Sequence, residues 1–174
     1  DHTLPTLRRQ WAETQAEIGQ WLSLYQIHSA TEASGVLDRD DVLDELARLR
    51  DDLPIEIGLT VSGPDSRQTV ERALTIERDG TRLFTCVQAT WNILEPSLSS
   101  TLAAAHAQGV RVIIKEALAN GRLTERNDDP AFAETRAMLE RAAARLNCTL
   151  DHLALAATLD QPWAQRVLSG AATI

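Results

Sequence analysis

Two side chains in the sequence are suited to direct chemistry, and each follows an apolar run. His28 follows the run 21–27, where a neutral imidazole can donate a hydrogen bond to a carbonyl oxygen or act as an acid or base. Lys115 follows the run 112–114, where desolvation would favour the neutral amine and suit Schiff-base chemistry. The alternatives are a structural histidine and a strand-end ion pair between Lys115 and Glu116.

A second group of polar side chains is suited to binding rather than to reaction. Gln88 and Asn92 flank Trp91. Their uncharged amides could pair with a ligand amide, and the indole could stack on a flat ring. His2, His106 and His152 fall at the chain's start or on predicted helices, where we interpret them as structural or solvated.

The composition predicts a soluble globular protein of the cytoplasm. Of its 174 residues, 44% are hydrophobic and 24% are charged, and the net charge of -8 does not suit a nucleic-acid partner. The apolar runs are shorter than the roughly 20 residues that cross a membrane. Cys86 and Cys148 lack metal-ligand spacing, so we expect small buried thiols and no metal site.

Hydrophobic periodicity predicts alternating helices and strands. Helices are expected over 4–19, 38–50, 66–77 and 96–108, and within 130–146 and 149–160. Strands are expected over 21–27, 55–61, 83–89, 110–114 and 166–168. Strands separated by helix-sized connections are typical of a parallel α/β fold with right-handed crossovers.

Polar residues follow each predicted strand, which favours a barrel over an open sheet. A rim of successive loops is typical of an eight-stranded α/β barrel, whereas an open doubly wound sheet concentrates its site at one switch point. No GxGxxG or P-loop motif follows a strand. Because five strands cannot close a barrel, we predict an incomplete TIM-barrel type, about five of eight βα units, in a single domain over 1–174. The strand-end residues are His28, Ser62, Gln88, Lys115 with Glu116, and Ser169.

Four segments resemble landmarks of the aldo-keto reductases, in family order and over nearly the whole chain. LYQIH at 24–28 resembles the fourth-strand signature LYxIH, and VQATWNILE at 87–95 resembles the sixth-strand Q-x-E-Y-N-x-L. VIIKEALANGRLT at 112–124 resembles the seventh-strand Y-x-P-L-x-x-G-x-L-T, and VLSGAAT at 167–173 the eighth-strand I-x-G-A ending. The resemblance implies strands four to eight of that family's barrel.

The resemblance also implies a role for each matching residue. His28 would be the catalytic histidine of the family's Asp-Tyr-Lys-His tetrad, which orients and polarises the substrate carbonyl. Ser62 and Gln88 would bind the nicotinamide carboxamide, and Lys115 stands where an aromatic side chain stacks on the ring. The cofactor's phosphates would meet the loop 118–124 and the chain's end, through Leu118, Asn120, Gly121, Leu123, Gly170 and Thr173.

Several positions depart from the family pattern. Gly63 stands where an asparagine usually follows the fifth-strand serine, and the amine of Lys115 cannot stack as a ring does. Trp91 replaces a tyrosine, and Thr90 replaces a glutamate. The tetrad's Asp, Tyr and Lys would precede the first residue, and the groups that grip a 2'-phosphate would follow the last. We therefore expect the 174 residues alone to be inactive.

The implied function is that of a portion of an NAD(P)H-dependent oxidoreductase that reduces aldehydes or ketones by hydride transfer, with NADP(H) favoured over NAD(H). Its partners would be a small carbonyl substrate and either the missing barrel strands or a self-association partner that covers the exposed sheet edges. Two alternatives stay open. One is a non-catalytic dinucleotide-binding member or remnant of the family, and the other is a Schiff-base lyase or aldolase that uses Lys115.

Overall fold

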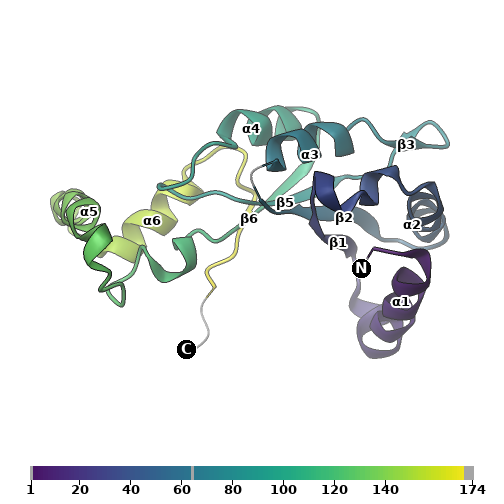
Figure 1. Ribbon diagram of the computed structural model, residues 1–174, viewed down its shortest axis with the longest axis horizontal. Helices are drawn as coiled ribbons and strands as arrows, with labels where there is room; N and C mark the ends of the chain where they lie inside the picture. The colour runs from purple at the N-terminus through teal and green to yellow at the C-terminus, as the bar shows by residue number, and fades with distance from the viewer. Residues whose placement is uncertain (1, 64, 171–174) are drawn as a thin grey trace. The chain divides into compact units, whose positions relative to one another are not determined.

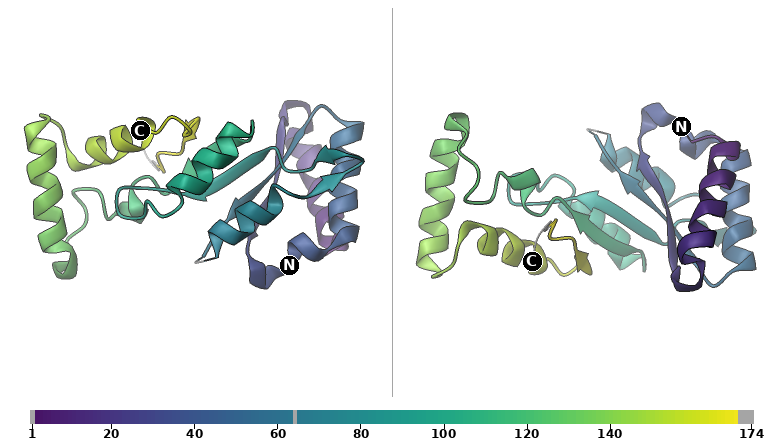
Figure 2. Two further views of the ribbon diagram at one scale, coloured as in Figure 1. Left: turned by 90° about the horizontal axis from the view of Figure 1, so that it is seen from above. Right: turned by 90° about the horizontal axis from the view of Figure 1, so that it is seen from below.

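The computed structural model describes residues 2–63 and 65–170. The chain divides into two compact units (Figures 1 and 2). The first comprises Asp1–Ala89 and Ala104–Arg111, and the second comprises Thr90–Ala103 and Val112–Ile174. The prediction of a single domain over 1–174 is not tested by this division and stays a prediction.

The first unit is a parallel sheet with helices between its strands. Strands β1, β2 and β5 are neighbours in that order, and both pairings are parallel. The helices are α1 (Leu4–Ile18), α2 (Asp40–Asp52) and α3 (Ser66–Ala73), with short 3-10 turns at Gly19–Trp21, Glu32–Ser34 and Val36–Asp38. The strands are β1 (Leu24–Ala30), β2 (Glu56–Val61), β3 (Glu77–Arg78), β4 (Thr81–Arg82) and β5 (Cys86–Thr90).

The second unit contains one parallel strand pair and two longer helices. Strand β6 (Arg111–Lys115) pairs in parallel with β7 (Arg166–Val167). Short 3-10 turns at Ala119–Gly121 and Pro130–Phe132 precede α5 (Ala133–Arg145) and α6 (Leu150–Leu159). Helix α4 (Ser99–Ala107) has residues in both units. The predicted parallel α/β class is confirmed, with small changes in the element bounds.

Two of those changes have clear physical causes. The first strand begins and ends three residues later than expected, because residues 19–21 form a 3-10 turn rather than extended chain. Helix α3 ends at Ala73 instead of position 77, and an antiparallel hairpin of β3 and β4 follows it. Its turn residues, Asp79 and Gly80, both have positive φ. Asp-Gly is a strong signal for such a turn, and the hairpin replaces the last turn of the helix that was expected over 66–77.

The core of the first unit lies between α2 and one face of β2. The predicted apolar stripe of α2 is buried, as are alternate side chains of β2. Because successive residues of a strand point to opposite faces, the intervening Gly58 and Thr60 belong to the other face of the sheet. The buried apolar residues are Val42, Leu43, Leu46 and Leu49 in α2 and Ile57, Leu59 and Val61 in β2.

Gly58 lets β1, β2 and β5 approach closely on that second face. A Cβ at position 58 would lie 2.8 Å from the carbonyl oxygen of Cys86, 3.0 Å from Cys86 Cβ and 3.2 Å from Gln26 Cγ. The nearest of these is a backbone atom, which cannot rotate away. Any larger residue at position 58 would therefore push β5 away from β2.

We predict that Gly58→Ala destabilises the protein by about 1–3 kcal/mol, the usual cost of overpacking a tight core. The measurement is urea unfolding of the variant. Gly19→Ala is the matched control, because only the flexible side chain of Gln15 lies near its Cβ position and its backbone is right-handed. Equal stabilities for wild type and Gly58→Ala would contradict a close approach at this point.

A nearly buried carboxylate connects α1 to α2. Glu45 is 9% exposed, and its oxygens accept hydrogen bonds from Arg48 Nη2 at 2.9 Å and from Arg8 Nη2 at 3.0 Å. These hydrogen bonds, that from Arg48 first and that from Arg8 second, lower the pKa of Glu45 below its ordinary value. The ionised form is therefore the one that stabilises the packing of α1 against α2.

We predict an acid-sensitive contribution from Glu45. Its folded-state pKa lies below its unfolded value, so the stabilisation is complete above about pH 4.5 and disappears as the pH falls through the folded pKa. Glu45→Gln should lower stability at pH 7 by about 1 kcal/mol and weaken the loss of stability on acidification. Thermal unfolding from pH 7 to pH 3 measures both. Glu13→Gln, which breaks an exposed pair with Arg9, should change little.

Candidate active site

His28, Thr60 and Gln88 lie on one face and at one edge of the first unit's sheet. Thr60 pairs in register with Gln88, and Ile27 pairs with Leu59. The residues after Ile27 and Leu59 therefore point to the face that Gln88 shares. Because the strands are parallel, their carboxyl ends meet at the same edge. The structure thus brings together the imidazole and the amide that the sequence singled out.

A β-bulge follows Ile27 and sets the position of His28. The register shifts between Ile27 and Ala30, and Ser29 has a left-handed φ of 54°. The Ser29 N–H donates to the hydroxyl of Thr60 at 3.0 Å, which replaces a regular ladder bond. Bulges often re-aim a side chain beside a functional site, and this one turns the chain at the histidine. Sequence patterns did not reveal it.

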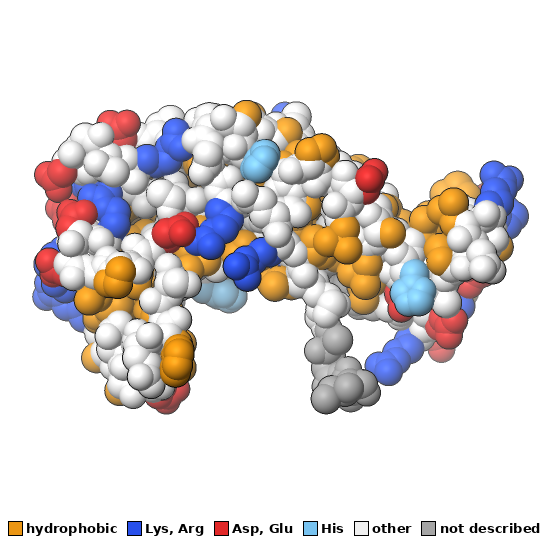
Figure 3. All heavy atoms as spheres, turned by 180° about the vertical axis from the view of Figure 1, so that it is seen from behind, with side chains coloured by type: hydrophobic (Ala, Val, Ile, Leu, Met, Phe, Trp, Pro, Cys, Tyr) orange, Lys and Arg blue, Asp and Glu red, His pale blue; other side chains and the backbone are white. Residues whose placement is uncertain are grey.

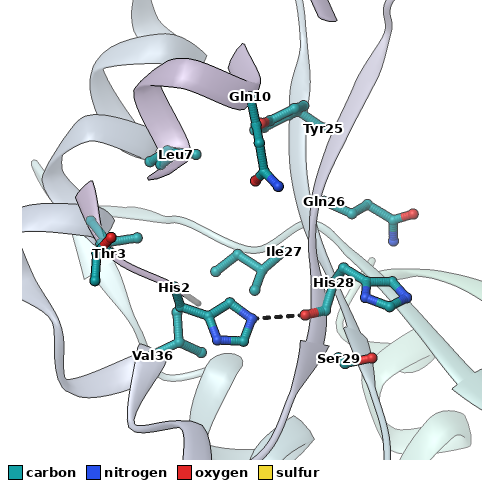
Figure 4. Close-up of a pocket in the computed structure, with 11 residues that line it drawn as sticks. His2, Thr3, Leu7, Gln10, Tyr25, Gln26, Ile27, His28, Ser29 and Val36 are labelled. Atoms are coloured by element: carbon teal, nitrogen blue, oxygen red, sulfur yellow. Dashed lines mark hydrogen bonds between the residues drawn. The ribbon is translucent and has the colours of Figure 1, made fainter. Parts of the chain in front are cut away.

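The ring and the backbone of His28 face different surroundings. Figure 4 shows the imidazole on the same side of β1 as Gln26, away from α1. The backbone carbonyl oxygen of His28 accepts a hydrogen bond from His2 Nε2 at 2.8 Å. His28 is exposed, so its ring is open to a ligand on the face of the sheet that it shares with Thr60 and Gln88. This face is called the inner face below.

A pocket of about 330 Å³ lies on the opposite side of β1, against α1. Ile27 and Gln10 point into it, and His28 borders it through its backbone (Figure 4). This pocket is therefore separate from the face that carries the imidazole. Tyr25 also borders it, with its ring edge-on against Trp11 at 5.0 Å.

Ser62 and Gly63 follow directly after β2. Ser62 is half-buried, and Gly63 has a φ of +85°. The Gly63 carbonyl accepts hydrogen bonds from Ser66 Oγ at 2.7 Å and from Ser66 N at 3.4 Å. Glycine adopts this left-handed backbone freely, and asparagine does so more readily than most residues. The replacement of asparagine by Gly63 therefore keeps the turn while removing an amide.

In the second unit, Lys115 ends β6 and is half-buried. Its carbonyl accepts from the N–H of Trp91 at 3.4 Å. The next residue, Glu116, has a φ of 58° and is held at two points. Thr90 Oγ1 donates to its carboxylate at 3.0 Å, and Asn92 Nδ2 donates to its carbonyl at 2.9 Å. Thr90 thus has a structural partner at the position where the family pattern has a glutamate.

Trp91 and Asn92 are structural residues, which corrects the expectation that they bind a ligand. Trp91 is 5% exposed, its Nε1 donates to Ser99 Oγ at 2.8 Å, and its ring packs edge-on against Trp163 at 5.6 Å. Asn92 is 1% exposed, and its Oδ1 accepts from two backbone N–H groups. The indole is therefore covered by packing, and the amide holds the backbone of its own loop and of Glu116. The spacing of these residues did not reveal their burial.

The loop 118–124 is tightly hydrogen-bonded within itself. The N–H groups of positions 119 and 121–124 each donate to a carbonyl between positions 116 and 121. Leu123 is fully buried in a cluster with Ala119, Leu150 and Ala154, against which Leu118 packs. Asn120 is exposed with a φ of 55°, and Gly121 has a φ of 90°. The predicted contact of this loop with a pyrophosphate stays a prediction.

The remaining predicted positions lie near the end of the chain. Gly170 is exposed with a φ of 67°, and Thr173 lies outside the described residues. Within residues 2–63 and 65–170, no group of three or more potential metal ligands is present. No helix in those ranges is long and apolar enough to span a membrane.

Comparisons with known proteins identify the fold. No family model and no curated protein matches the chain. Solved structures do match, among them a glycerol dehydrogenase, AKR11B4, from Gluconobacter oxydans, and the holo form of an aldo-keto reductase, AKR11C1, from Bacillus halodurans. The TM-scores are 0.70 and 0.73, at 19% and 16% sequence identity. The chain has a partial aldo-keto reductase-like fold.

The extent of the match explains why the sheet is incomplete. The aligned region covers 97% and 96% of this chain but only 56% and 55% of the two solved chains. The chain therefore spans little more than half the length of these aldo-keto reductases. The predicted class, an incomplete parallel barrel of TIM type, is confirmed, because the described ranges contain five parallel strands instead of eight.

We predict that the Thr60 hydroxyl holds the bulge beside His28. In Thr60→Val the Ser29 N–H loses its acceptor, whereas Thr60→Ser retains one. The exchange of the Ser29 amide proton, followed by NMR, should be roughly fivefold faster in Thr60→Val, as expected for a hydrogen bond with a net contribution of about 1 kcal/mol. If both variants exchange alike, the bulge does not depend on this hydroxyl.

Proposed function

We propose that this chain is part of a cytoplasmic NAD(P)H-dependent oxidoreductase that reduces aldehydes or ketones, with NADP(H) preferred to NAD(H). The observation that carries the proposal is the common face of His28, Thr60 and Gln88 at the carboxyl edge of parallel strands. It is supported by the partial aldo-keto reductase-like fold and by a solved neighbour that is a glycerol dehydrogenase.

The donor set of the first unit fits a nicotinamide amide and a carbonyl substrate. Gln88 is half-buried on the inner face, where its amide can pair with a carboxamide through one donor and one acceptor. Ser62 follows the adjacent strand and supplies a hydroxyl near the same edge. The nicotinamide, when bound, supplies the hydride. His28 donates a hydrogen bond to the substrate oxygen and so stabilises the negative charge that develops there.

The proton for the substrate oxygen has to come from another residue. The sequence contains one tyrosine, Tyr25, which neighbours Ile27 on the α1 side of the strand and packs against Trp11. Burial raises the pKa of its phenol. It faces away from the imidazole of His28 (Figure 4), so it cannot serve that site. In our proposal the tyrosine donor, with the tetrad's Asp and Lys, belongs to strands outside these 174 residues.

The partners that we propose follow from the same geometry. A small carbonyl compound is the substrate. The missing barrel strands, or a self-association partner, cover the edges that five strands leave open. The non-catalytic family member and the Lys115 Schiff-base enzyme remain alternatives. Lys115 is the only lysine of the 174 residues. Borohydride trapping of a substrate on the intact protein, with the adduct mapped to Lys115 by peptide mass spectrometry, would test that second alternative directly.

We predict that the 174-residue chain alone does not oxidise NADPH in the presence of 4-nitrobenzaldehyde, because in our proposal the tyrosine that supplies the proton lies outside it. The intact protein that contains it should do so, followed by absorbance at 340 nm. In the intact protein, His28→Ala should lower kcat/KM by about 10²- to 10⁴-fold, and Gln88→Leu should mainly weaken cofactor binding. The control is His152→Ala, at an exposed position of α6.

Each result separates the alternatives. Sustained turnover by the chain alone would contradict the missing donor. Normal NADPH binding without turnover in the intact protein would favour the non-catalytic member. A borohydride-stable adduct that maps to Lys115 would favour the Schiff-base enzyme.

A further inference from the structure

A short turn follows β1 and lies close to His28. It consists of Thr31 and the 3-10 turn Glu32–Ser34, and is called the rim turn below. Because a residue adds at most about 3.6 Å to the length of a chain, position 32 lies within roughly 14 Å of position 28. The loops that follow parallel strands border the same edge of the sheet. The rim turn is therefore a neighbour of the edge where His28, Thr60 and Gln88 meet.

The rim turn is braced within itself and has a buried anchor on each side. The Ser34 N–H donates to Thr31 Oγ1 at 3.1 Å, and the Thr31 N–H donates to Ser34 Oγ at 3.2 Å. Ala30 before the turn and Val36 after it are fully buried, and Gly35 between the turn and Val36 has a φ of 60°. We therefore expect the turn to move as one piece between two fixed points, with a tilt that depends on its side-chain contacts.

Helix α3 clamps the rim turn through Glu32. The Glu32 carboxylate accepts hydrogen bonds from Thr69 Oγ1 at 3.3 Å and from Arg72 Nη1 at 3.4 Å. Thr69 is fully buried, and Arg72 Nη2 also pairs with Asp38, further along the same loop. Because α3 follows β2, this clamp of Thr69 and Arg72 on Glu32 and Asp38 ties the loop after one strand to the helix after the neighbouring strand.

A second arginine makes a similar pair of contacts away from the rim turn. Arg78, in β3, donates to Asp40 at 2.7 Å and to Asp44 at 2.6 Å, both in α2. Figure 3 shows acidic (red) and basic (blue) side chains interspersed over one face of the molecule. Exposed ion pairs contribute little to the free energy of unfolding. The two arginines therefore differ mainly in what they position, which is the rim turn for Arg72 and a helix for Arg78.

We propose that the rim turn forms one wall of the substrate entrance beside His28, and that Arg72 is a positioning residue that holds this wall in place through Glu32. The inference rests on the proposed oxidoreductase function. Arg72 touches neither the substrate nor the cofactor. It sets the fraction of time for which the turn occupies the position that binds substrate, so its loss raises KM and leaves the hydride-transfer step unchanged.

The test uses the intact protein with saturating NADPH and the uncharged substrate 4-nitrobenzaldehyde. Arg72→Gln and Glu32→Gln should each raise KM about fivefold, the largest effect expected from one exposed ion pair, with kcat and the Kd of NADPH unchanged. Because both side chains act through one contact, the double variant should be no worse than either single variant. High salt should raise the KM of the wild type more than that of the double variant. Arg72→Lys keeps the charge and should raise KM less than Arg72→Gln.

Arg78→Gln is the matched control, because Arg78 pairs with two carboxylates as Arg72 does but does not contact the rim turn in these pairs. Its KM should equal that of the wild type. The Tm of each single variant should fall by no more than about 4 °C. Hydrogen exchange of the peptide 31–37, measured by mass spectrometry, should be faster in Arg72→Gln and in Glu32→Gln but not in Arg78→Gln.

Several outcomes would overturn the proposal. An unchanged KM in Arg72→Gln would remove the entrance role, and an equal rise in Arg78→Gln would indicate a general loss of packing. A fall in kcat with no change in KM would place the effect at the reacting groups. Normal turnover with unchanged exchange of residues 31–37 in Arg72→Gln would overturn the clamp alone. Absence of turnover by the wild type would overturn the oxidoreductase assignment and the entrance together.

Discussion

The close parallel pairing of β1, β2 and β5 is the constraint on which the candidate site depends. Gly58 allows β5 to approach β2 so closely that no Cβ fits between Cys86 and Gln26. Two residue pairs further along, Thr60 pairs with Gln88 and accepts a hydrogen bond from the N–H of Ser29. The same register therefore aligns the amide of Gln88 and fixes the bulge that presents His28. A shift of one residue in β2 would move these groups to the opposite face.

The two faces of β1 carry different side chains. The inner face carries His28 and shares its edge with Gln88, which suits a carbonyl substrate and an amide-bearing cofactor. The opposite face carries Tyr25 and Ile27, which line a pocket together with residues of α1.

The second unit shows how a sequence landmark can persist with its polar groups used for structure. Thr90 and Asn92 both bind Glu116, and Trp91 packs against Trp163. The segment that resembles a cofactor shelf is thus partly a packing element. The loop 118–124 also uses its groups for structure. Leu123 is buried in the core, and most of the loop's N–H groups donate to carbonyls at positions 116–121. Its two exposed members, Asn120 and Arg122, are the groups best placed to meet a ligand.

The sequence alone determined the parallel α/β class, the order of the elements and their approximate bounds, because these follow from local periodicity and from the spacing of apolar residues. It also singled out His28 and Gln88, whose neighbours along the chain resemble family signatures. Only the tertiary structure decided that a bulge at Ser29 presents the histidine and that Trp91 and Asn92 are buried. Each of these depends on contacts between residues far apart in sequence, such as Ser29 with Thr60 and Asn92 with Glu116, and periodicity carries no information about such contacts.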